Sequence, residues 1–260
     1  MELIMIKIAC QTILYGNPTI KDNIENILKN VHENGYDGVE VGARHFYMDR
    51  SAYYINLLAQ NNLEIPAIHI GGDFLNRDSV SDQIASIDNT IVFANKLGCK
   101  YIYLSGCYRK DKTAEDYLYE AHVYNEIGKH CCAAGLMLCY HNHDWEFADN
   151  AMGMKILLQK ITAENMKLVP DVGWITIGGA DPVEFLKVNA ERIEALHFKD
   201  FLRPKQFTEI GTGIVNFKGV YEFFKTIKEN SWITAEQDQT SRTPEESSKA
   251  NYEFISKMVK

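Results

Sequence analysis

The sequence is short of positive charge and has no long hydrophobic run. Its 260 residues include 27 Lys and Arg against 35 Asp and Glu, which gives a net charge of −8. Nucleic-acid surfaces take their affinity from clustered Lys and Arg, so this balance argues against a nucleic-acid partner. The apolar opening from Met1 to Cys10 is interrupted by Lys7 and is too short for a bilayer span or a signal segment. We therefore expect no membrane association.

Cysteine motifs are also missing. The six cysteines have no C-x-x-C spacing and are too sparse for a disulfide scaffold. We therefore predict reduced thiols in a cytoplasmic protein. The composition, 46% hydrophobic and 24% charged, is that of a globular chain with enough apolar content to form a core.

Short, nearly continuous apolar runs recur along the chain, as in parallel strands that are buried on both faces. They begin near Ile4, Asp37, Ile65, Lys100, Leu136, Lys167, Ile193 and Trp232. Their mean spacing of about 33 residues is that of one βαβ step. Eight steps predict a (β/α)₈ TIM barrel, an α/β fold, with residues 1–260 as one domain. A doubly wound open sheet is the alternative, but no glycine-rich phosphate loop follows the first run.

Helical patterns fill the intervals between the predicted strands. One extends from Pro18 to Asn34, with Asn17 as its cap, and another begins at Val80 and stops at Gly98. The last helix opens with Thr243-Pro244-Glu245-Glu246, a capping-box sequence with proline in the first turn.

Polar residues stand at the predicted strand ends, where a barrel of this kind builds its active site. They are Glu40, His69, His141, His143, Glu146, Asp171, His197, Lys199 and Glu236. Asp171, His197 and Glu236 form a mixed oxygen and nitrogen set that suits Mn²⁺, Mg²⁺ or Co²⁺ and is also compatible with zinc. The alternative is that these charges only pair with one another.

Several motifs, in this order, resemble one known family over essentially the whole chain. The motifs are residues 35–40, 140–143, 146–147, 171–174, 197–200 and 211–213, followed by Glu236. The chain resembles the sugar-phosphate isomerase/epimerase group of xylose-isomerase-like barrels, to which inosose dehydratase, tagatose epimerase and the abasic-site endonucleases are related. The resemblance implies a TIM barrel, a carbohydrate substrate and a homo-oligomer.

The resemblance also implies one divalent metal ion. By motif, three of the family's ligands correspond to Asp171, His197 and Glu236. The fourth, at the end of strand five, is usually a glutamate where this chain has His141, and we assign Glu146 to this role because it restores the family's charge. Trp174 stands where some relatives have a histidine, which argues against a site with several metals.

The implied reaction is isomerisation or epimerisation of a sugar or sugar phosphate, with proton transfer beside a metal-bound carbonyl by Glu146 and Glu236. With His143 as the acid/base, the same site would suit a dehydratase or lyase acting on a keto-inositol or 3-keto sugar. An abasic-site endonuclease and a non-catalytic sugar-binding barrel are less favoured. The predicted substrate-binding residues are Glu40, His69, His141, Lys199 and Trp174, and the alternative for Lys199 is a salt bridge to Asp200 or a neighbour.

Overall fold

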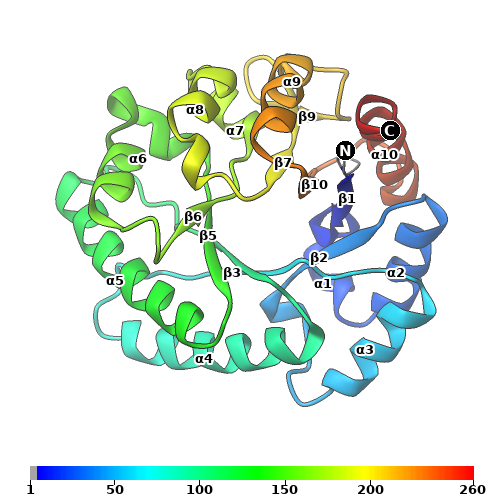
Figure 1. Ribbon diagram of the computed structural model, residues 1–260, viewed down its shortest axis with the longest axis horizontal. Coiled ribbons are helices and arrows are strands. Elements are labelled where there is room, and N and C mark those ends of the chain that lie inside the picture. Colours follow the sequence, from blue (N-terminus) through cyan, green and yellow to red (C-terminus); the bar gives the residue numbers. More distant parts are fainter. Residues whose placement is uncertain (1–4) are drawn as a thin grey trace.

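The computed structural model describes residues 5–260 and contains an eight-stranded parallel sheet surrounded by helices (Figure 1). The strands are β1 (Met5–Gln11), β2 (Gly38–Gly42), β3 (Ala67–Gly71), β4 (Tyr101–Ser105), β5 (Met137–His141), β6 (Lys167–Leu168), β7 (Leu196–Phe198) and β10 (Asn230–Ala235). Their order in the sheet is β6-β5-β4-β3-β2-β1-β10-β7.

Two isolated parallel bridges join the ends of this sheet. They pair Leu168 with Ile193 and Asp171 with His197, and so connect β6 to the segment of β7. The predicted TIM barrel is confirmed, and each predicted strand run contains or adjoins an observed strand. The expected start at Ile4 lies outside the described residues.

Ten α-helices lie in the described part of the chain. They are α1 (Asn17–Ile20), α2 (Ile24–Glu33), α3 (Ser51–Gln60), α4 (Val80–Leu97), α5 (Ala114–Ala133), α6 (Ala148–Lys160), α7 (Val172–Ile177), α8 (Pro182–Val188), α9 (Phe217–Ile227) and α10 (Pro244–Val259). α4 ends at Gly98, whose φ of 79° is the left-handed conformation that glycine adopts readily. α10 begins with the predicted capping box at Thr243.

The single helix predicted from Pro18 to Asn34 is wrong, because the chain forms α1 and α2 with a break between them. Asn23 has a non-helical φ of −118° and is the residue from which α2 starts. Asn17 does not cap a helix, since its Oδ1 accepts a hydrogen bond from Arg44 Nη2. The apolar spacing therefore identified the buried face but not the break.

Side chains fill the barrel interior, so there is no open pore. The inner cluster comprises Ala9, Ala67, Tyr103, Cys139, Val169, Ala195 and Trp232. Neighbouring strand residues point outward into the larger core against the helices, as Ile8 and Leu138 do. Burial on both faces explains why the strands are nearly continuous in apolar residues.

An antiparallel hairpin that the sequence did not predict follows β7. Its strands are β8 (Asp200–Leu202) and β9 (Gln206–Thr208). The Asp200 carboxylate accepts N–H hydrogen bonds from Phe201, Gly211, Gly213 and Val215. A Cβ at Gly213 would lie 2.3 Å from Asp200 Oδ1, so only glycine fits there. The Gly211-x-Gly213 motif thus binds an internal carboxylate.

All six cysteines are free thiols, in agreement with the sequence. Among residues 5–260, no helix has the length and apolar character needed to cross a membrane. The cytoplasmic location stays a prediction.

Candidate active site

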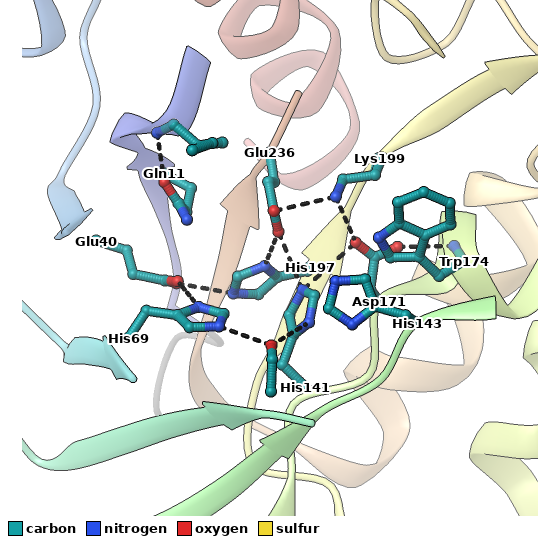
Figure 2. Close-up of polar contacts among 12 residues, drawn as sticks. Gln11, Glu40, His69, His141, His143, Asp171, Trp174, His197, Lys199 and Glu236 are labelled. Atoms are coloured by element: carbon teal, nitrogen blue, oxygen red, sulfur yellow. Dashed lines mark hydrogen bonds and ion pairs between the residues drawn. The ribbon is translucent and has the colours of Figure 1, made fainter. Parts of the chain in front are cut away.

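The polar strand-end residues gather at one end of the barrel (Figure 2). The residues that form this group are Glu40 (β2), His69 (β3), Ser105 (β4), His141 (β5), Asp171 (after β6), His197 (β7) and Glu236 (after β10). All are buried except His69, which is half-buried. Because parallel strands of a barrel end on the same side, side chains distant in the sequence come together here.

Four of these residues have the arrangement of a metal centre. One ligand atom from each of His141, Asp171, His197 and Glu236 lies within 4.8 Å of the others. Glu236 Oε2 is 3.0 Å from His141 Nε2 and 2.6 Å from His197 Nδ1. Asp171 Oδ2 is buried and has no hydrogen-bond partner in the described part of the chain, which fits an oxygen kept for a ligand. Two imidazoles and two carboxylates suit a divalent transition metal.

Glu146, expected as the strand-five ligand, lies outside this group. Tyr140 Oη donates to Glu146 Oε1 at 2.9 Å, and the His143 backbone N–H donates to Glu146 Oε2 at 2.6 Å. Side chains alternate along a strand, and Tyr140 belongs to the outer core while His141 faces the barrel interior. Glu146 pairs with Tyr140 and so lies on the outer side. The structure therefore corrects this expectation and places His141 among the potential ligands.

A network of hydrogen bonds and ion pairs orients the three imidazoles. Glu40 Oε1 lies 2.8 Å from His69 Nδ1, and Glu40 Oε2 lies 2.7 Å from His197 Nε2. Ser105 Oγ connects His69 Nε2 at 2.7 Å with His141 Nδ1 at 3.2 Å. Although burial opposes both charges, His197 and His69 lower the pKa of Glu40 to about 2, and Glu40 and Glu236 raise that of His197 to about 10. Such partners fix the direction in which a ligand ring points.

Lys199 supplies a buried positive charge beside the four residues. Its Nζ is 2.7 Å from Asp238 Oδ2, 3.0 Å from Glu236 Oε1 and 3.5 Å from Asp171 Oδ2. Burial alone would lower the pKa of Lys199, but the three carboxylates raise it, so the ammonium stays charged. The salt bridge expected as the alternative for Lys199 thus forms with these neighbouring carboxylates and not with Asp200, whose carboxylate is bonded to backbone N–H groups.

Aromatic rings enclose His143. Its ring stacks on Trp145 with a centroid distance of 4.1 Å and an interplanar angle of 7°, and Trp174 lies 5.5 Å away. His143 Nδ1 is buried without a hydrogen-bond partner among the described residues. Burial lowers the pKa of His143 well below its usual value, which keeps the ring neutral.

A cavity of about 530 Å³ opens beside the four potential ligands. Among the residues that line it are four predicted site residues, His69, His141, His143 and Glu236. The structure therefore brings these four together around one cavity. Glu40, Lys199 and Trp174, predicted to bind substrate, are not among the lining residues in the described chain. Glu40 contacts the site through His197, and Lys199 contacts it through Glu236. Trp174 contacts Lys199.

Sequence reasoning missed Gln11, Ser105 and Asn142. Each lies at or directly after the last residue of a strand. This position at a strand end was the one feature of the sequence that could have indicated a place in the site. Asn142 holds the segment of Asp171 in place, because its side chain accepts from the Asp171 backbone N–H at 3.1 Å and donates to its carbonyl at 3.2 Å.

Replacing Glu146 with glutamine is expected to flatten the pH dependence of stability. Burial raises the pKa of Glu146 to about 7. The folded state then binds this proton more tightly than the unfolded state, so stability decreases as the pH rises through the window from about 4.3 to about 7. In urea unfolding at pH 5 and pH 8, the wild type should lose about 2 kcal/mol more than Glu146→Gln. Equal losses in the two proteins would contradict this assignment.

The fold and the buried histidine–carboxylate group together define a TIM barrel with a candidate metal centre at the C-terminal ends of its strands. The chain belongs to the family described as Xylose isomerase-like TIM barrel, whose sequence model matches residues 28–258. The family resemblance found in the sequence is thereby confirmed.

Individual relatives match 90% or more of the chain. A protein of Geobacillus kaustophilus (strain HTA426) named inosose dehydratase is 26% identical, over 90% of this chain and 87% of its own. The crystal structure of a sugar phosphate isomerase/epimerase from Parabacteroides distasonis has a TM-score of 0.81 at 19% identity, over 98% and 100% of the chains. The crystal structure of the probable 3-DHS dehydratase AsbF of Bacillus anthracis has a TM-score of 0.78 at 17% identity. The match covers 96% of this chain and 99% of that chain. These structural likenesses show the shared fold.

Proposed function

We propose that this protein is a metal-dependent dehydratase that removes water from a cyclic keto-polyol of the inosose class. The observation that carries the proposal is the end of strand five. His141 stands at the position of the expected second glutamate, and Glu146 is bonded on the outer side. The half-buried His143 lines the cavity, and its Nδ1 has no hydrogen-bond partner in the part of the chain that the structure describes. The name of the relative from Geobacillus kaustophilus supports the same reaction.

The residues that would hold the divalent ion are His141, Asp171, His197 and Glu236. A bound divalent ion would act as a Lewis acid that polarises the substrate carbonyl and acidifies the neighbouring C–H group. Lys199 offsets the negative charge of Asp171 and Glu236, and the contacts of Glu40 and Ser105 hold the imidazoles in place.

His143 is the acid/base in this proposal. It takes the proton from the carbon next to the carbonyl, and the electron pair of that C–H bond forms a C=C bond to the following carbon. His143 then gives this proton to the hydroxyl on that carbon, which leaves as water, so the products are an enone and one water molecule. The stack on Trp145 fixes the plane of the His143 ring during both proton transfers.

An isomerase or epimerase is the second candidate, because His143 and Glu236 line the same cavity from different strands. Two groups in these positions could remove a proton from one side of the substrate and return it on another. In that reaction no water is released.

The test is to incubate the Mn²⁺-loaded protein with an inosose in D₂O and to follow the ultraviolet absorbance of the enone. We expect the enone to form with loss of one hydroxyl group. Deuterium incorporation without loss of water would favour the isomerase or epimerase. If neither the inosose nor a ketohexose reacts with the metal-loaded protein, both candidates are wrong.

A further inference from the structure

Gln11 is the last residue of β1 and lies at the same end of the barrel as the site. It is the register partner of Glu40 on β2, and only 7% of it is exposed. Its Oε1 accepts the backbone N–H of Ile13 at 2.5 Å, which caps the short 3₁₀ segment Thr12–Tyr15. Because an N–H donor requires an acceptor, the amide oxygen must face Ile13. The amide nitrogen is therefore fixed on the opposite side.

The two N–H donors of Gln11 Nε2 have no acceptor among residues 5–260 and face the cavity. Gln11 lines the 530 Å³ cavity together with His69, His141 and Glu236. Figure 2 shows the amide nitrogen on the side of the site where Glu40 and His197 lie. These donors have no protein acceptor among the described residues, so an oxygen of a ligand in the cavity could accept from them.

We propose that Gln11 is a substrate-binding residue that donates from its side-chain amide to a hydroxyl oxygen of the substrate. This inference rests on the proposed function and identifies one contact by which the site recognises a polyol. The cavity wall supports an uncharged group. Its one Arg or Lys side chain within residues 5–260 is Arg44, which is exposed and already donates to His45 and Asn17.

A fixed donor of this kind makes the site selective. A site built to hydrogen-bond a substrate oxygen discriminates against an analogue that lacks the oxygen, because the protein donor is then left unpaired. Gln11 should therefore recognise one hydroxyl position of the substrate. Removing the hydroxyl at that position should remove the contribution of Gln11, and removing any other hydroxyl should not.

Two substitutions separate this role from the cap on Ile13. Gln11→Glu keeps an oxygen for the Ile13 N–H and removes both amide donors, while Gln11→Met removes donors and acceptor. Gln83→Met is the matched control, because Gln83 also lines the cavity but its Nε2 already donates to the Asp73 carbonyl and Ser79 Oγ. Thermal unfolding shows whether each variant is folded.

The probes are an inosose, its mono-deoxy analogues and myo-inositol, with kcat/KM and calorimetric binding to the Mn²⁺-loaded proteins as readouts. Both Gln11 variants should lose about 10- to 100-fold in kcat/KM for the inosose, and Gln83→Met less than about 3-fold. For one deoxy analogue, the Gln11 variants should equal the wild type. Equal losses for every analogue would reduce Gln11 to a structural cap and overturn the inference.

Binding distinguishes this inference from the proposed reaction. If the wild type binds myo-inositol without turning over the inosose, and the Gln11 variants bind it about 10-fold more weakly, the reaction is wrong and Gln11 keeps its role. If the variants bind myo-inositol as tightly as the wild type, or if the wild type binds none, the inference on Gln11 is wrong.

Discussion

Replacing His141 with alanine is expected to weaken Mn²⁺ binding by more than about 100-fold, since loss of a ligand should exceed the 10- to 100-fold typical of outer-shell changes. The imidazole of His141 lies 3.0 Å from Glu236 Oε2 and 3.5 Å from Asp171 Oδ2, within the group of potential ligands. Titration calorimetry and the metal content of the purified protein measure the effect.

Glu146→Gln is the matched control for the strand-five ligand. Its carboxylate is bonded to Tyr140 and to the His143 backbone, so the variant should bind Mn²⁺ within about 3-fold of the wild type. Anomalous scattering from Mn²⁺-soaked crystals gives an independent answer. An ion coordinated by Glu146, with His141 turned away, would restore the ligand that the sequence suggested.

Replacing His143 with alanine is expected to lower kcat by about 10²- to 10⁴-fold, the usual contribution of a general acid/base. Metal content should be unchanged, because His143 is not one of the four residues whose ligand atoms converge. The experiment is steady-state dehydration of an inosose combined with metal analysis of the same preparation.

Trp145→Phe serves as the control for His143→Ala, because a phenyl ring at position 145 can still stack on the imidazole of His143. It should retain most of the activity if the stack only orients the ring. A loss of less than about 10-fold in His143→Ala would mean that this histidine positions the substrate, as expected of an isomerase that uses other groups for proton transfer.

The sequence was sufficient for the barrel and for three of the four potential ligands. Strands buried on both faces are apolar along nearly their whole length, so their positions could be found from the apolar runs in the sequence. Asp171, His197 and Glu236 follow directly from these strands, because the ends of parallel strands meet at one rim.

The choice between His141 and Glu146 could not be made from spacing. It depends on the turn after β5, where the Glu146 carboxylate is bonded to Tyr140 Oη and the His143 N–H. Glu146 was favoured because a carboxylate would give the site the same charge as in the family. Tyr140 points outward from the barrel, however, and its hydrogen bond holds the Glu146 carboxylate on that outer side. Gln11 was missed for a similar reason, since a glutamine in a strand gives no sign that its oxygen is bonded and its nitrogen free.

The barrel closes between β6 and β7, at a seam of isolated bridges that includes two residues of the site, Asp171 and His197. Of the described residues, the bridge pairs here are Leu168 with Ile193 and Asp171 with His197, with hydrogen bonds from Glu194 N to Leu168 O and from His197 N to Pro170 O. We expect the amides at such a sparse joint to exchange with solvent through local opening, without global unfolding. Each such opening would separate the bridge partners Asp171 and His197. Any ligand that engages both side chains therefore slows hydrogen exchange along this seam before it changes exchange elsewhere in the barrel.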